Sequence, residues 1–446
     1  MTTRLLLRGG CVLTLGAKTP NFTQADLLID DGRVADVGTE LRARDAEVVD
    51  ATDTIVMPGF VDTHRHAWKS LFRNLGERVS SGEASPSATD VGDRSQPEDV
   101  YAATLIGLLG AVEAGITTVV DWSDLQLDEG VAEAALQAHA DAGLRTVFVY
   151  AARPQAQRHE HGRPTTRQLL TRLADAAGPS TIIAFGSGAL APTDLDRVAA
   201  DWAVARELSM PIHADAGSKT SGRGVISRLA ERGLLGADVT LVHCSELDDA
   251  DLDAIASSGA AVSLAPSSEM AGGLGSPPIQ QLIDRDIRPG LGVGDEQVTP
   301  GDMFAQMRAT ISLQHATVFD RRLAGKAGLP RLMSTRDVIR YATVEGARVA
   351  GSGGVTGSLE PGMHADIIML RTDRPNIFPI NDPIGAVVWG MDTSNVDWVF
   401  VAGRPLMRSG ALEANVEQAR NLATTAQHRV AAAAGHAVGT APEGEW

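Results

Sequence analysis

His64 and His66 are separated by a single arginine in the sequence Val-Asp-Thr-His64-Arg-His66. Side chains alternate between the two faces of a β-strand, so both imidazoles would lie on one face while Arg65 points to the other. Two neutral imidazoles one pleat apart are suitable ligands for a single divalent metal ion. The pair is therefore a candidate metal site, although a chance occurrence of two such histidines is the alternative.

Three further polar residues each end a short apolar segment. His213 ends Met-Pro-Ile-His, His243 ends Thr-Leu-Val-His, and Asp295 ends Gly-Leu-Gly-Val-Gly-Asp. A hydrogen-bonded core histidine would explain one such position, but burying unpaired polar groups at several strand ends is costly. The set therefore indicates one polar site to which several strands contribute.

The segments that must position these residues alternate between strand-like and helix-like patterns from residue 58 onward. Eight strand–helix units in about 290 residues predict a parallel (β/α)8 barrel of the TIM type, whose functional residues gather at the carboxyl ends of the strands. A doubly wound open sheet is the alternative, and the number of units favours the barrel. No glycine-rich nucleotide fingerprint follows the first strand. The expected strands are Val61–His66, Ile116–Asp121, Thr146–Ala151, Thr181–Ala184, Met210–Ala214, Val239–Cys244, Ala261–Leu264 and Ile287–Asp295.

Short strand patterns also occur on both sides of the barrel segment, including the run Ala386–Trp389. We expect them to form one small β-sandwich domain built from both chain ends, which makes the fold class α/β. The expected divisions are residues 1–57 and 354–410 for that domain, 58–353 for the catalytic barrel, and 411–446 for a helix and tail. The polar segment Ser80–Gln96 is a candidate mobile loop over the site.

Composition limits the classes of function. The chain has 446 residues, 43% of them hydrophobic, and a formal net charge of −17. This acidic balance argues against nucleic acid or an anionic membrane as a partner. Two cysteines make no disulfide framework, and no apolar run has the length of a membrane span or signal sequence. We expect a cytoplasmic protein that acts on a small molecule.

Several of these motifs together resemble the amidohydrolase superfamily. The sequence Pro58-Gly-Phe-Val-Asp-Thr-His-Arg-His66 is similar to the first-strand motif of that family, and His213, His243 and Asp295 follow in the family's order. Residues 357–370 resemble the segment that leads back into its second domain. Residues 261–270 and 301–308 are similar to segments of the branch that contains cytosine deaminases and triazine hydrolases.

The resemblance implies His64, His66, His213 and Asp295 as metal ligands. His243 then corresponds to the histidine that hydrogen-bonds the attacking water or the polarised substrate, and Asp295 also moves the proton. Members with two metals use a lysine on the fourth strand, and Thr181-Ile-Ile-Ala-Phe-Gly contains none. One divalent ion per chain is therefore expected, zinc first and iron as the alternative. A homo-oligomer is expected because similar proteins commonly form one.

One family feature is missing. Deaminases of this branch carry a glutamate three residues after the fifth-strand histidine, and this chain has Ala216 there. Candidates to replace that glutamate are Asp215, Glu246 and Glu269, each of which a solvated loop would also explain.

Other candidate substrate contacts are Trp68, Asp121 and Asp124, with barrel packing as the alternative for the tryptophan. His159 and His161 form a second His-x-His pair in a polar segment, where we do not expect a second metal.

These observations support three hypotheses. The first is a metal-dependent hydrolase that activates water to attack an electron-poor carbon of a nitrogen heterocycle, by deamination or by displacement of another group. The second is a hydrolase that opens a cyclic amide or amidine. The third is an inactive scaffold with the same fold, which the retained His and Asp residues disfavour.

Overall fold

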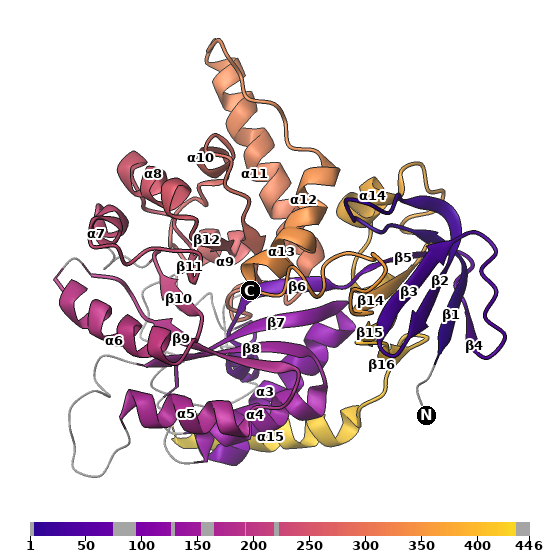
Figure 1. The fold of residues 1–446 in the computed structure, drawn as a ribbon, viewed down its shortest axis with the longest axis horizontal. Helices are drawn as coiled ribbons and strands as arrows, with labels where there is room; N and C mark the ends of the chain where they lie inside the picture. Colours follow the sequence, from indigo (N-terminus) through magenta and orange to yellow (C-terminus); the bar gives the residue numbers. More distant parts are fainter. Residues whose placement is uncertain are drawn as a thin grey trace, which may run out of the picture.

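The computed structural model describes residues 4–74, 95–125, 130–152, 165–191, 193–217 and 223–433. Most of the candidate loop Ser80–Gln96, the pair His159 and His161, and the expected tail lie outside these residues. The described chain forms two sheets, and Figure 1 shows the barrel with its helices beside a second sheet built mainly from the first and last parts of the colour scale.

The larger unit is a parallel barrel of eight strands, arranged in sequence order around the sheet. The last strand comes back to the first: the amide of Gly294 donates to the carbonyl of His64 at 2.7 Å, and the amide of His66 donates to the carbonyl of Gly294 at 3.2 Å. The predicted (β/α)8 barrel is therefore confirmed. Its strands are β6 (Phe60–Arg65), β7 (Ile116–Ser123), β8 (Arg145–Ala152), β9 (Thr181–Ser187), β10 (Ile212–Asp215), β11 (Val239–Val242), β12 (Ala261–Leu264) and β13 (Gly290–Leu291).

The helices that cover the barrel begin where capping groups satisfy their first amides. Asp248 accepts a hydrogen bond from Asp251 at the start of α8, and Asp302 accepts one from Ala305 at the start of α11. The end of α11 extends away from the barrel body (Figure 1). The helices are α3 (Pro97–Glu113), α4 (Val131–Ala142), α5 (Thr166–Ala176), α6 (Leu195–Glu207), α7 (Val225–Glu231), α8 (Asp249–Ser258), α9 (Pro266–Ala271), α10 (Ile279–Ile283), α11 (Met303–Leu323), α12 (Thr335–Tyr341) and α13 (Val344–Val349).

The second sheet has nine strands and combines segments from both sides of the barrel in the sequence. Strand β5 pairs with β1 in parallel and with β14 antiparallel, so Met57 lies opposite Ile368. A separate apolar core lies under this sheet. Its strands are β1 (Leu5–Val12), β2 (Phe22–Asp30), β3 (Arg33–Gly38), β4 (Glu47–Asp50), β5 (Thr54–Pro58), β14 (Ile367–Arg371), β15 (Val396–Val401), β16 (Arg404–Arg408) and β17 (Ala411–Leu412).

The strand expected at Ala386–Trp389 is wrong. The chain there forms helical turns, α14 (Pro383–Gly385) and η3 (Ala386–Gly390), which begin where Asp382 accepts a hydrogen bond from Ile384. The adjacent residues Val387 and Val388 are both buried, which a helical turn against a core allows. A short apolar run does not distinguish a buried strand from a buried helical turn.

Helix α15 (Val416–Ala433) lies along α3, on the opposite side of the barrel from α11 (Figure 1). The side-chain Nε2 of Gln427 donates to the carbonyl of Leu71 at 3.0 Å, and Arg429 donates to the buried carboxylate of Asp99 at 2.6 Å. The last described helix therefore supports the segment that follows the first barrel strand. None of the described helices is long and apolar enough to cross a membrane.

Arg65 is fully buried at the seam where β6 meets the segment after β13. Its guanidinium donates to Asp62 at 2.8 Å, to the carbonyl of Gly301 at 2.7 Å, and to Glu296. Glu296 also accepts from Ser70 at 2.7 Å and from Arg73 at 2.8 Å. This network joins the first strand of the barrel to the loop that follows the last one.

Replacing Arg65 should destabilise the whole fold. In Arg65→Met the buried carboxylates of Asp62 and Glu296 lose their main cation, and removing one partner of such a pair costs roughly 3–5 kcal/mol. The control is Arg167→Met, whose partner Glu207 is 61% exposed, so the loss should stay below about 1 kcal/mol. Urea unfolding measures both. Equal losses in the two variants would show that the seam does not depend on Arg65.

Candidate active site

His64 lies at the centre of a group of rings at the carboxyl end of β6. Its ring centroid is 5.0 Å from that of His66 and 5.0 Å from that of His243, and 5.5 Å from the ring of Trp122. The side chains of His64 and His66 thus lie together on one face, in the geometry that strand alternation predicts. Burial, followed by the neighbouring charges, lowers the pKa of His64 well below its usual value. His64 is therefore neutral at neutral pH.

Lys69 enters the same site, although none of the sequence motifs described above includes it as a candidate residue. The residue lies in the short helix η1 (Ala67–Phe72), directly after β6, and its ammonium group is 3.1 Å from the carboxylate of Asp295 and 4.0 Å from that of Asp124. The signal available in the sequence was its position one helical turn after His66. The ammonium group of Lys69, in η1, thus lies between the carboxylates of Asp295 and Asp124 at the end of the strand that carries the histidines.

Trp68 and Asp124, both predicted substrate contacts, contact each other. The indole of Trp68 donates to Asp124 at 2.8 Å, and the Nδ1 atom of His66 lies 3.4 Å from the same carboxylate. Burial would raise the pKa of Asp124, but Lys69, His66 and Trp68 together lower it below its usual value. Asp124 is therefore an ionised group beside His66, and Trp68 is buried against it.

His243 follows β11, and its backbone has a positive φ of 74°. A Cβ atom at Gly217 would overlap the Cβ of His243, so only glycine fits at that neighbouring position. The Nδ1 atom of His243 lies 3.0 Å from Glu269, which is completely buried. Burial would lower the pKa of His243, but Glu269 and the charge of Asp215 outweigh it and raise the pKa.

His213 is buried in β10, near enough to His64 for their charges to interact. Burial lowers the pKa of His213 to about 4, so its imidazole is neutral at neutral pH. Ala216, which stands where the family has a glutamate, is also buried.

The remaining predicted contacts lie in different surroundings. One carboxylate oxygen of Asp121 accepts a hydrogen bond from the backbone amide of Ala67 at 2.8 Å, and the other lies 2.8 Å from Nε2 of His139. Both oxygens therefore already have protein partners. Asp215 is half-buried and accepts a hydrogen bond from Gly217 at 2.9 Å. Glu246 is exposed in the loop after β11. The solvated-loop interpretation thus agrees with the exposure of Glu246 and is wrong for the buried Glu269.

The donor chemistry of the site fits a divalent metal ion. The Nδ1 atoms of His64 and His213 are buried without a hydrogen-bond partner, and both imidazoles are kept neutral, which is the form that binds metal. Within the described part of the chain, however, no three His, Cys, Asp or Glu side chains are already arranged to hold one ion. Coordination by His64, His66, His213 and Asp295 would therefore require side-chain shifts.

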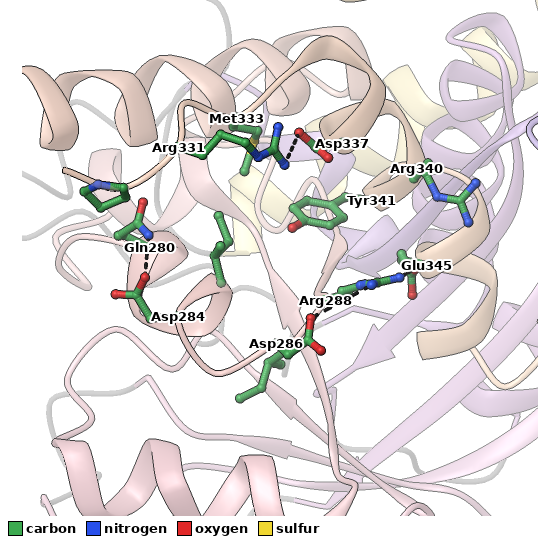
Figure 2. Close-up of a pocket in the computed structure, with 13 residues that line it drawn as sticks. Gln280, Asp284, Asp286, Arg288, Arg331, Met333, Asp337, Arg340, Tyr341 and Glu345 are labelled. Carbon is green, nitrogen blue, oxygen red and sulfur yellow. Dashed lines mark hydrogen bonds and ion pairs between the residues drawn. The ribbon is translucent and has the colours of Figure 1, made fainter. Parts of the chain in front are cut away.

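A separate pocket of about 390 Å³ lies at the other end of the barrel (Figure 2). It lies where the chain enters β13, between α10 and α12, and its charged residues face one another. Arg331 is paired with Asp337 at 3.0 Å, and Arg288 lies 3.7 Å from Glu345. Because TIM barrels place catalytic groups at the carboxyl ends of their strands, this pocket is not the active-site candidate.

Comparison with protein families decides the class of the protein. The model of the amidohydrolase family matches residues 55–406, which is most of the chain. The chain belongs to the amidohydrolase family. This amidohydrolase is therefore a hydrolytic enzyme, in agreement with the resemblance in its sequence motifs.

Two curated relatives span nearly the same length. A 5-methylthioadenosine/S-adenosylhomocysteine deaminase of Syntrophus aciditrophicus is 28% identical and covers 94% of this amidohydrolase and 96% of its own length. A 5'-deoxyadenosine deaminase of Methanothermobacter thermautotrophicus is also 28% identical, covering 92% and 94%.

Two solved structures share the fold. Atrazine chlorohydrolase from Arthrobacter aurescens, complexed with zinc, superimposes with a TM-score of 0.80 at 21% identity, covering 95% of this amidohydrolase and 100% of that chain. An adenosine deaminase from Xanthomonas campestris with bound zinc gives a TM-score of 0.78 at 20% identity, covering 96% and 98%. These similarities concern the architecture, which agrees with the barrel and second sheet described above.

The depressed pKa of His213 predicts an acid-labile contribution to stability. Below its ordinary pKa of 6.5 the unfolded chain binds a proton that folded His213 binds only near pH 4, so stability falls as the pH decreases through this interval. Between about pH 7 and about pH 5 the wild type should lose about 2 kcal/mol more than His213→Gln. Urea unfolding of chelator-treated protein measures this difference.

The exposed His428 supplies a matched control. His428→Gln should keep the pH dependence of the wild type. A His213→Gln variant with that same dependence would contradict the assignment.

Proposed function

We propose that this amidohydrolase is a metal-dependent aminohydrolase that releases ammonia from an aminated nitrogen heterocycle. The observation that carries the proposal is that candidate catalytic side chains come together at one mouth of the barrel. The ring of His64 contacts those of His66 and His243. Asp295 forms an ion pair with Lys69, which follows the same strand. The named relatives support deamination, because both act on adenosine derivatives. Adenine nucleosides are therefore the first substrate class to test.

We further propose one divalent ion per chain, zinc first and iron as the alternative, held by His64, His66, His213 and Asp295. When bound, such an ion lowers the pKa of a coordinated water toward neutrality and polarises the atom under attack. The buried imidazoles with unpartnered nitrogens support this ligand set. Asp295 supplies the only negative charge among the four ligands, and Lys69 lies against it.

The chain's own groups supply the proton transfers. Asp295 is placed to accept the proton of the attacking water and to pass it to the leaving amine. His243, held beside His64, can accept a hydrogen bond from the attacking water through the ring nitrogen that carries no hydrogen. The strand-end positions thus separate the proton carrier from the histidine that hydrogen-bonds the attacking water.

The missing fifth-strand glutamate keeps a second reaction open. With Ala216 buried at that position, no carboxylate there protonates a ring nitrogen before ammonia leaves. Opening of a cyclic amide or amidine needs only proton delivery to the ring nitrogen that becomes the leaving group, so we retain it as the alternative. The homo-oligomeric state and cytoplasmic location remain predictions from the sequence.

The deciding experiment assays zinc-loaded protein against aminated, halogenated and cyclic-amide heterocycles, with adenine nucleosides included. We expect ammonia release with an intact ring, detected enzymatically and by ultraviolet absorbance. Asp295→Asn should lower kcat by at least ~10²-fold, because the variant carries no carboxylate to move the proton. Metal analysis of the purified protein should give one divalent ion per chain.

Asp284→Asn is the matched control. Asp284 lines the pocket at the opposite end of the barrel and accepts a hydrogen bond from Gln280, which the asparagine oxygen can also accept. This variant should keep wild-type activity. Ring opening without ammonia would favour the alternative reaction, and full activity of Asp295→Asn would overturn the assigned mechanism.

A further inference from the structure

Glu269 is a buried carboxylate for which the proposed reaction has no assigned use. It lies in α9, its side chain has no exposed surface, and its Oε2 atom is buried without a hydrogen-bond partner. Burying an ionisable group in this way costs free energy unless specific contacts offset the cost. Its Oε1 atom makes those contacts, and they lead to the active site.

The Oε1 atom of Glu269 joins two elements. It accepts a hydrogen bond from the backbone amide of Ala265 at 2.7 Å, and it lies 3.0 Å from Nδ1 of His243. The first contact fixes the carboxylate relative to the end of β12. The second can form only when Nδ1 of a neutral His243 carries the hydrogen, because a carboxylate oxygen accepts. The remaining ring nitrogen, Nε2, is then free of hydrogen.

We propose that Glu269 is a positioning residue that fixes the tautomer and orientation of the His243 ring. The inference rests on the proposed function, because it gives a purpose to the orientation of a histidine assigned there to hydrogen-bond the attacking water. A buried acid that holds a histidine in one tautomer is a general device of hydrolytic sites. Glu269 acts through His243 and does not contact the reacting atoms.

The surroundings of His243 leave its ring little other support. The residue has a positive φ, lies outside the regular part of β11, and packs at Cβ against Gly217. The ring edge contacts His64, itself a candidate metal ligand. A ring on such an irregular segment depends on side-chain contacts for its orientation, and the hydrogen bond to Glu269 is the contact that the structure provides.

Two substitutions separate the acceptor from the charge. Glu269→Gln keeps an Oε1 atom that can accept from both His243 and Ala265, whereas Glu269→Leu fills a similar space without an acceptor. We expect kcat to fall on the order of 10²-fold in the leucine variant and within about 10-fold in the glutamine variant, with KM changing less than about 3-fold in both. Recovery by glutamine would identify the hydrogen bond as the working interaction.

A spectroscopic measurement tests the proposal without relying on activity. Nitrogen NMR of histidine-labelled protein in alkaline buffer reports which ring nitrogen carries the hydrogen, and His243→Asn assigns the signal. We expect the hydrogen on Nδ1 in the wild type and in Glu269→Gln, and a mixture of tautomers in Glu269→Leu. A wild-type ring with its hydrogen on Nε2 would overturn the proposal even if the leucine variant failed to fold.

Glu345→Leu is the control for general destabilisation. Glu345 is also buried and paired with arginines, but it lies at the opposite end of the barrel. Its loss should lower the urea midpoint and leave kcat and the His243 signal unchanged. A wild-type enzyme inactive on every heterocycle would reject the proposed function and leave the tautomer result standing, whereas an active enzyme with unchanged kcat in Glu269→Leu would reject the positioning role.

Discussion

Closure of the barrel depends on one buried cation. The last strand, β13, has only two residues, so few ladder hydrogen bonds join it to β6. Arg65 compensates by binding Asp62 within its own strand and Glu296 and Gly301 beyond β13. The same three-residue segment thus performs two tasks: His64 and His66 face the site, while the intervening arginine holds the seam.

This arrangement ties the geometry of the site to the stability of the fold. Asp295 immediately precedes Glu296, so the ion pair at the seam also fixes the backbone that carries a candidate catalytic carboxylate. On the other side, η1 brings Lys69 to Asp295 and Ser70 to Glu296. The site is therefore assembled from segments that the buried network already holds together, and catalytic groups need little independent support from loops.

Much of the architecture could be predicted because each barrel strand is an apolar run bounded by turns. The run Ala261–Leu264 forms β12 with the predicted bounds. The expected strand Ile287–Asp295 is regular over two residues only, because its alternating glycines bring no side chains to pack and allow a sharp bend. At Ala386–Trp389 the apolar pattern predicted a strand. The chain forms helical turns there instead, which also bury its apolar side chains against the core.

The site was predictable where it follows strand alternation and not where it depends on tertiary contacts. His64 and His66 lie together because side chains two residues apart in a strand point to the same face. The position of Lys69 one helical turn after His66 was too weak a signal, because a lysine in a helical turn usually points to solvent. Glu269 was considered as a substrate contact, but its bond to His243 depends on how the end of β12 turns into α9, which residue spacing alone does not reveal.

The pairing of β5 with β14 has a consequence for biosynthesis. These neighbouring strands are separated by the entire barrel in the sequence, so the nine-stranded sheet cannot be completed until the ribosome has translated the barrel. Helix α15, whose Gln427 caps the carbonyl of Leu71 beside the site, is translated later still. During translation β1, β2 and β5 therefore exist for a time without β14. The edge of β5 that later pairs with β14 is then exposed to aggregation, and it is the surface that a chaperone would have to shield.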